Sequence, residues 1–129
     1  MLSQSVDSPV QLLPIGALSS GNDGSKLSEM YDMQHTGAVA FYDYQKSLSD
    51  SNFVKIALQY SGSFNALICL FPYDSSICEN GLMHEGYYST LLGLNGIPSL
   101  AEYMRIQRDL SLLEYSGGKI HIPLSLIHI

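Results

Sequence analysis

Stretches that are apolar at nearly every position alternate along this chain with stretches whose apolar residues recur every three or four positions. The first pattern is typical of strands buried on both faces, and the second of helices with one buried face. The patterns predict strands over residues 10–18, 38–42, 64–71 and from about 119, and helices over residues 25–35, 51–60 and 98–116. This order indicates βα units that build a parallel sheet covered by helices. A doubly wound sheet and part of a (β/α)₈ barrel both fit it.

The last predicted helix is the longest and has the clearest boundaries. Pro98 suits its first turn because the missing N–H would be unpaired there, and Gly117 accepts the left-handed conformation that ends a helix. One stripe of apolar residues recurs along it at helical spacing: Tyr103, Ile106, Leu110 and Leu113. We therefore expect this stripe to face the core.

Composition and charge narrow the classes of function. The 129 residues are 46% hydrophobic and 14% charged, which is typical of one globular domain. A net charge of −6 without a cluster of Lys or Arg argues against nucleic acid and anionic membranes as partners. No apolar stretch has the roughly 20 residues needed to span a bilayer. Cys69 and Cys78 lack C-x-x-C spacing and follow no signal peptide, so we expect reduced thiols in a cytoplasmic protein rather than a disulfide.

Four stretches resemble the dihydroorotase family in order and spacing. They are PIGAL at 14–18, EM-x-D-M at 29–33, GAVAF-x-D at 37–43, and the run 85–121, which contains EG-x-x-S-x-x-LGL-x-GIP-x-x-AE, an RD pair and GGKIH. The family is a group of metal-dependent amidohydrolases with a (β/α)₈ barrel of about 250 residues or more. The resemblance thus implies a partial (β/α)₈ TIM-type barrel, with about four parallel strands that correspond to strands three to six. The metal-binding H-x-H of the first strand and the catalytic Asp of the eighth would lie outside this chain.

The last six residues stand apart from this resemblance. Residues 124–129, LSLIHI, match the translation of an adapter used in sequencing libraries. We therefore expect residues 1–123 to be the barrel fragment and residues 124–129 to be an adapter-derived tail. On this interpretation His128 has no functional role.

Asp43 is the candidate metal ligand. It directly follows a predicted strand, at the strand end that faces the active site in α/β barrels. The resemblance gives this position to the first Asp of an FSDDG motif, which reaches the metal centre, where a carboxylate is a suitable hard ligand. The motif departs from the family pattern here, because Tyr44 replaces the second Asp and Gln45 the Gly. An Asp after a strand is also often only a turn former.

The next strand end lacks a ligand that the resemblance implies. Where metal-dependent family members carry HCED, with the His binding zinc, this chain carries Phe71, Pro72, Tyr73 and Asp74. A phenyl ring has no lone pair to donate, so Phe71 cannot replace an imidazole. The following ligand His would align with Leu124, in the suspected tail.

The other histidines and the tyrosines favour structural roles. We expect His121 to be a hydrogen-bonded core residue inside a buried strand rather than a metal ligand. His84 and Glu85 are adjacent on an extended segment and should point to opposite sides, which argues against an acid/base pair. His35 should interact with the last carbonyls of its helix. Amphipathic packing rather than a ligand platform is expected for three tyrosines: Tyr87, Tyr88 and Tyr115.

Two hypotheses about function follow. In the first, the parent protein is a dihydroorotase that interconverts dihydroorotate and N-carbamoyl-L-aspartate in pyrimidine biosynthesis, with zinc polarising the carbonyl and generating hydroxide. In the second, the parent is a non-catalytic relative that serves as a structural partner, for instance of aspartate carbamoyltransferase, or assembles as a homo-oligomer. Phe71 favours the second hypothesis. In either case we expect this chain alone to bind no zinc and to be inactive, because four strands cannot close an eight-stranded barrel.

Overall fold

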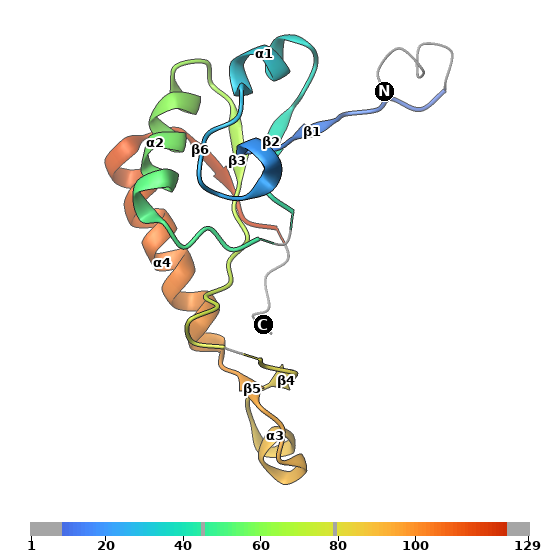
Figure 1. The fold of residues 1–129 in the computed structure, drawn as a ribbon, viewed down its shortest axis with the longest axis vertical. Coiled ribbons are helices and arrows are strands. Elements are labelled where there is room, and N and C mark those ends of the chain that lie inside the picture. The colour runs from blue at the N-terminus through green and yellow to red at the C-terminus, as the bar shows by residue number, and fades with distance from the viewer. Residues whose placement is uncertain (1–8, 45, 79, 124–129) are drawn as a thin grey trace.

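A four-stranded parallel sheet is the centre of the fold (Figure 1). The computed structural model describes residues 9–44, 46–78 and 80–123. The sheet order is β1-β2-β3-β6, formed by β1 (Ile15–Gly16), β2 (Ala40–Tyr42), β3 (Leu67–Cys69) and β6 (Lys119–His121). Every neighbouring pair is parallel. The predicted α/β architecture with four parallel strands is therefore confirmed, and it is compatible with part of a (β/α)₈ barrel.

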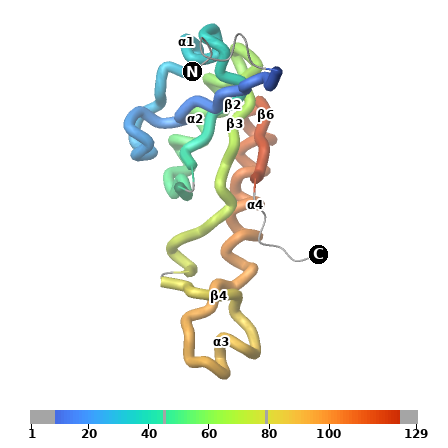
Figure 2. The backbone as a smooth tube through the Cα atoms, turned by 90° about the vertical axis from the view of Figure 1, so that its right-hand side faces the viewer, coloured from blue at the N-terminus to red at the C-terminus, as the bar shows by residue number. Residues whose placement is uncertain are grey.

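Helices connect these strands and cover the sheet. They are α1 (Met30–His35), α2 (Ser51–Gly62) and α4 (Ser99–Ser116), with a short 3₁₀ turn (Ser20–Asn22) after β1. The Asp50 side chain caps α2 by accepting a hydrogen bond from the Asn52 N–H at 2.8 Å. Helices α2 and α4 lie side by side against the sheet (Figures 1 and 2). None of the described helices is both long and apolar enough to cross a membrane.

The hydrophobic core lies between the sheet and α2. Its largest members are fully buried and come from the sheet, from α2, from α1 and from the loop after β1: Leu18, Met30, Phe41, Val54, Leu58 and Ile68. Burial of such side chains stabilises the fold by about 1.5–3 kcal/mol each. The two central strands, β2 and β3, are mostly buried, as the sequence pattern predicted. The edge strands are not, because Ile15 in β1 and Lys119 and His121 in β6 are exposed.

The buried face of α4 differs from the predicted one. Tyr103 and Leu110 are 59% and 47% exposed, so the prediction that their stripe faces the core is wrong for these positions. Leu113 does pack against the core. The fully buried positions of this helix are mostly charged: Ala101, Glu102, Arg105 and Asp109. The hydrophobic periodicity did not predict this face because charged side chains count as polar positions in the pattern, even where they are buried with hydrogen-bond partners.

A small lobe between β3 and α4 was not predicted from the sequence. It consists of β4 (Met83–His84), α3 (Tyr87–Leu92) and β5 (Gly96–Ile97), with β4 and β5 paired in parallel. Figure 2 shows the lobe projecting from the amino-terminal end of α4, away from the four-stranded sheet. Strands of two residues leave almost no periodicity to detect. We call residues 80–98 the lobe.

Candidate functional site

The carboxyl ends of the four strands meet along one edge of the sheet, which we call the rim. In the strand register Tyr42 lies opposite Cys69, and Cys69 lies opposite His121. Asp43 directly follows β2, and Phe71 comes two residues after β3. The structure therefore brings the two predicted positions to the same edge of the sheet, where the ends of parallel strands form active sites in α/β folds.

Asp43 is buried at the rim and is held by the loop that follows β1. Its Oδ1 accepts hydrogen bonds from the backbone N–H groups of Leu18 at 2.9 Å and Ser19 at 3.0 Å. Its Oδ2 accepts a hydrogen bond from the Ser19 hydroxyl, which in turn accepts one from the Gly24 N–H at 2.8 Å. A buried carboxylate must be hydrogen-bonded in this way to avoid a large desolvation cost. Asp43 therefore joins the ends of β1 and β2.

These bonds bear on the ability of Asp43 to bind a metal. Each carboxylate oxygen already accepts at least one hydrogen bond from the protein. Among the described residues there is no group of three or more His, Cys, Asp or Glu side chains that could hold a metal ion. Catalytic zinc generally needs three protein ligands. The described residues therefore do not by themselves supply a complete set of zinc ligands, even though Asp43 occupies the position that the family resemblance gives to a ligand.

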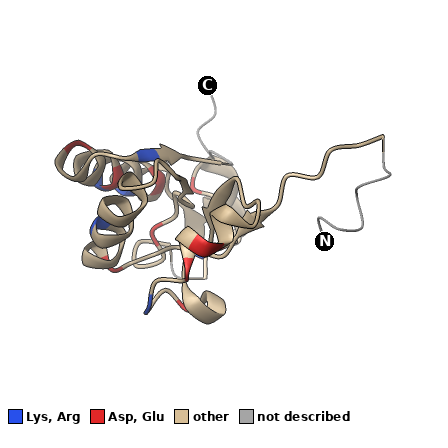
Figure 3. Cartoon of the chain, turned by 90° about the horizontal axis from the view of Figure 1, so that it is seen from above, with Lys and Arg blue, Asp and Glu red and all other residues tan. Residues whose placement is uncertain are grey.

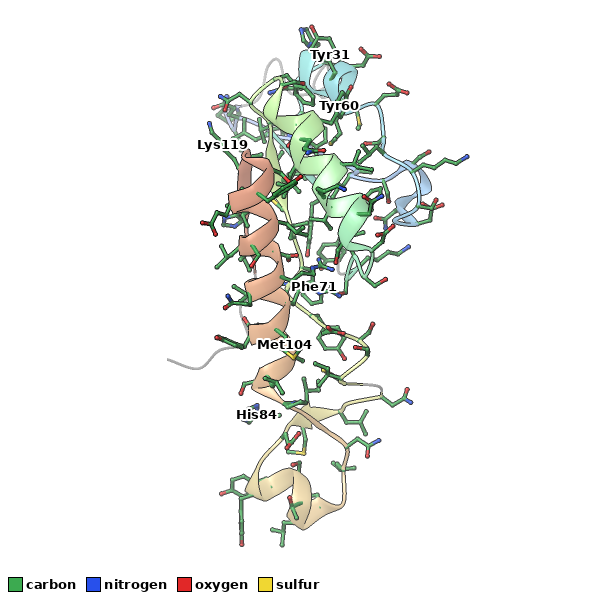
Figure 4. All side chains as sticks on the ribbon, turned by 90° about the vertical axis from the view of Figure 1, so that its left-hand side faces the viewer. Tyr31, Tyr60, Phe71, His84, Met104 and Lys119 are labelled. Carbon is green, nitrogen blue, oxygen red and sulfur yellow. The ribbon has the colours of Figure 1, made fainter. Side chains whose placement is uncertain are left out.

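Phe71 packs as an aromatic residue at this edge. It is half-buried, and the centroid of its ring lies 6.0 Å from that of Tyr73 with an interplanar angle of 31°. Figure 4 shows Phe71 where the chain leaves the sheet toward the lobe, and His84 far away within the lobe. Neither Phe71 nor Tyr73 offers the imidazole nitrogen that zinc sites use.

The histidines have different environments from one another. The predicted burial of His121 is wrong, because its side chain is exposed at the end of β6. Strand β6 has a neighbour on one side only in the described sheet, which explains this exposure. The prediction for His35 is confirmed, since its Nδ1 lies 3.0 Å from the Tyr31 carbonyl oxygen. His84 is exposed.

Both cysteines are free and buried. Burial raises the pKa of the Cys69 thiol above its ordinary value, and burial likewise raises that of Cys78. A raised pKa reduces the thiolate fraction, so neither side chain has the character of a nucleophile.

Sequence reasoning missed a cluster of hydrogen bonds centred on Arg105. The cluster lies against the loops that follow β2 and β3 at the rim, which we call the rim loops. The guanidinium of this buried residue donates to the Leu48 carbonyl at 2.7 Å, to the Tyr73 carbonyl at 3.3 Å and to the Ser47 hydroxyl. The Ser47 hydroxyl also donates to the Tyr73 carbonyl. Arg105 thereby ties α4 both to the loop after β2 and to the loop after β3. Burial lowers the pKa of Arg105, and the neighbouring charge of Arg108 lowers it further.

Arg108 and Asp109 complete this cluster. Arg108 donates from Nε to the Asp109 Oδ1 at 2.9 Å and from Nη1 to the carbonyls of Leu48 at 2.9 Å and Ser49 at 3.2 Å. Burial raises the pKa of the Asp109 carboxyl, and the positive charges of Arg108 and Arg105 oppose that change. The RD pair had suggested only a family resemblance, and its spacing gave no indication of these partners in a loop about 60 residues earlier.

Among the described residues, the charged side chains outside this cluster form no group that suggests a ligand. Figure 3 shows few basic positions, and they do not gather into one patch. This distribution agrees with the chain's net charge of −6 and gives no support to a nucleic-acid interface.

Comparison with known proteins completes the description of the chain. A family model described as "Dihydro-orotase-like" matches residues 4–128. Proteins named dihydroorotase from Pelotomaculum thermopropionicum and Acetivibrio thermocellus are each 42% identical, over 88% and 90% of this chain. One from Desulfotalea psychrophila is 35% identical over 95% of the chain. These matches cover 26%, 27% and 29% of the three relatives, so the chain spans about a quarter of their length.

Proposed function

This chain belongs to the dihydroorotase-like family, and we propose that it forms one side of a longer barrel, a side that binds no metal. The order of the four parallel strands supports this placement, because consecutive strands of a (β/α)₈ barrel are neighbours. The similarity to about a quarter of each relative supports the proposal of a longer barrel. We further propose that residues 124–129 are an adapter-derived tail, which lies outside the described residues.

For the whole protein we propose a non-catalytic, structural function in the cytoplasm. The observation that carries this proposal is at the rim, where the carboxylate of Asp43 is bonded to the loop after β1. The family resemblance, which gives the position of Phe71 to a zinc-binding His, supports it as well. Zinc would supply a polarised carbonyl and a hydroxide in the active relatives. The described residues do not form a site for it, and we therefore derive no catalytic step. Aspartate carbamoyltransferase is the partner that we propose from the family resemblance.

A catalytic dihydroorotase is the second candidate function. The identity of 42% to proteins of that name favours it. Such an enzyme would act on dihydroorotate or N-carbamoyl-L-aspartate through ligands supplied by other strands, with Asp43 as the contribution of this segment. It would have to function without an imidazole at Phe71.

The full-length protein that carries this segment distinguishes the two candidates. We expect no stoichiometric zinc by elemental analysis after purification without chelators, and no turnover of dihydroorotate. The dihydroorotase of Acetivibrio thermocellus, purified and assayed in parallel, is the positive control. Bound zinc together with turnover would refute the non-catalytic function and support the enzyme. Comigration with aspartate carbamoyltransferase in size-exclusion chromatography tests the proposed partner.

A further inference from the structure

A short segment of chain leads from the sheet toward the lobe and carries hydrogen bonds of its own. We call residues 73–78 the clasp. The Tyr73 hydroxyl donates to the Cys78 carbonyl at 3.1 Å, and the Cys78 thiol donates to the Asp74 carbonyl at 3.3 Å. The Ile77 N–H donates to the same Asp74 carbonyl at 3.2 Å. The clasp is therefore a closed turn rather than an extended connector.

Three donors from two other segments meet at the Tyr73 carbonyl oxygen. Arg105 of α4 donates to it from Nε and from Nη2, both at 3.3 Å. The Ser47 hydroxyl, from the loop after β2, is the third donor. The Nη2 group of Arg105 also donates to the Ser47 hydroxyl. The clasp, α4 and the loop after β2 thus share one connected set of hydrogen bonds, which we call the junction.

The lobe is attached to the clasp at one end and to α4 at the other. At its base the Leu82 N–H donates to the Asn95 carbonyl and the Glu85 N–H to the Ile97 carbonyl, both at 3.0 Å. A Cβ on Gly81 would lie 2.3 Å from Cγ1 of Ile97, so the chain next to the clasp lies directly against β5. A shift of the lobe therefore acts on the clasp and on the start of α4 at the same time.

The outer side chains of the lobe take no part in these contacts. Tyr87 and Tyr88 contact each other, with ring centroids 5.4 Å apart, and they are 75% and 68% exposed. The prediction that they pack inside the protein is therefore wrong for the described residues, and the same holds for Tyr115, which is also exposed. The link between the lobe and the sheet depends on the clasp and on α4 instead.

The hydrogen bonds of the junction favour an opening of all its parts together. Arg105 is only 4% exposed, and a buried donor left without an acceptor costs more than one hydrogen bond contributes. If the clasp alone moved away, the guanidinium and the Ser47 hydroxyl would both lose the Tyr73 carbonyl. A half-broken network of this kind is unfavourable, so its segments open as one cooperative unit.

From these contacts we propose that residues 46–50, the clasp and the lobe form one cooperative unit, which opens while the four-stranded sheet remains folded. The unit is a conformational device that transmits a movement of the lobe to the rim through the junction. It requires neither a metal nor a catalytic step, so it remains open to test if the proposed function fails. Its hydrogen bonds all lie within this chain, and they do not depend on what covers the lobe in the longer protein.

Amide hydrogen exchange in the full-length protein, followed by mass spectrometry of peptides, tests this proposal. Ser47→Ala removes a hydroxyl of the junction that lies outside the lobe. We expect the amides of residues 80–86 to exchange roughly two- to tenfold faster, as for the loss of one hydrogen bond, and those of residues 46–50 to change by the same factor. Tyr73→Phe should have the same effect. A common factor is the signature of one opening that exposes all these amides.

A matched control removes a similar hydrogen bond elsewhere on α4. Ser111→Ala takes away the bond from the Ser111 hydroxyl to the Gln107 carbonyl at 2.8 Å, so exchange in the lobe and in residues 46–50 should be unchanged. The sheet is the internal reference, because the Leu70 N–H donates to the His121 carbonyl at 3.0 Å and should keep its wild-type rate. In Ser47→Ala, faster exchange of residues 46–50 alone, or equally faster exchange at Leu70, would overturn the proposal.

Gly96→Ala tests the link in the opposite direction. The new Cβ would lie 2.6 Å from the Cα of Glu85, so it strains the base of the lobe without touching the junction. Coupling between two sites is reciprocal, and residues 46–50 should therefore exchange faster by the same factor as residues 80–86. This variant still decides the question if the junction variants fail to fold. Faster exchange in the lobe with a wild-type rate in residues 46–50 would show that the lobe opens alone and that the proposal is wrong.

Discussion

Replacement of Arg105 by Met should destabilise the full-length protein by about 3 kcal/mol. A hydrogen bond to a charged group contributes about 1.5–3 kcal/mol, and Arg105 donates to three acceptors, from Leu48, Tyr73 and Ser47. The loss is smaller than the sum of these bonds for two reasons. The Leu48 carbonyl keeps a bond from Arg108, and the desolvation of the guanidinium no longer opposes folding. Met keeps the packing of the aliphatic stem.

Urea denaturation measures this loss as a lower midpoint with an unchanged slope. Gln107→Met is the matched control, because this exposed residue lies on the same helix and should change stability by less than about 0.5 kcal/mol. Arg105→Lys keeps the charge but not the planar fork, so it should recover less than half of the loss. Wild-type stability in Arg105→Met, or an equal loss in Gln107→Met, would refute the proposed link between α4 and the rim loops.

Four further predictions follow from the structure. Asp43→Ala should cost about 3 kcal/mol in urea, because it leaves two buried N–H groups of the loop after β1 without an acceptor. Burial raises the pKa of Asp109 in the folded state above its value of about 4 in the unfolded state. Ionising Asp109 therefore lowers the free energy of unfolding, by nothing at pH values below about 4 and by more as pH rises through the folded-state pKa. Asp109→Asn should therefore gain stability relative to the wild type from pH about 4 to neutral pH, and the opposite trend would show that the ion pair with Arg108 dominates. Gly96→Ala should speed proteolysis within the lobe while the four-stranded sheet stays folded, because the new Cβ meets Glu85. Residues 1–123 alone should aggregate without a cooperative unfolding transition, since β1 and β6 have open edges among the described residues.

Sequence alone predicted the parallel sheet because strands buried on both faces leave a continuous apolar signal. The run containing Ile68 is an example, although its observed strand has three residues and the predicted one eight. The prediction extended too far because burial continues on both sides of the observed strand, at Ala66 and Leu70. The apolar pattern indicates which residues are buried. Strand boundaries instead depend on backbone hydrogen bonding to the neighbouring strand, and the pattern contains no information about it.

The position of Asp43 at the rim was also predictable, but its partners were not. A residue that directly follows a buried strand must lie at the carboxyl edge of a parallel sheet. Two of the three groups that bond its carboxylate are backbone N–H groups more than 20 residues earlier, and every residue except proline has such a group. No residue type marks them, and only the register of β1 against β2 brings them to Asp43.

Among the described residues, hydrogen bonds within the protein link the strand ends at the rim, and this connects the structure with the proposed function. A metal centre in a barrel links the ends of several strands, and its loss would leave those ends to be held by other means. Here Asp43 joins β1 to β2, and Arg105 joins the loops after β2 and β3 to α4. From the proposed non-catalytic function we expect the stability of the full-length protein to be unchanged by a chelator, and a lower urea midpoint after chelation would contradict that function.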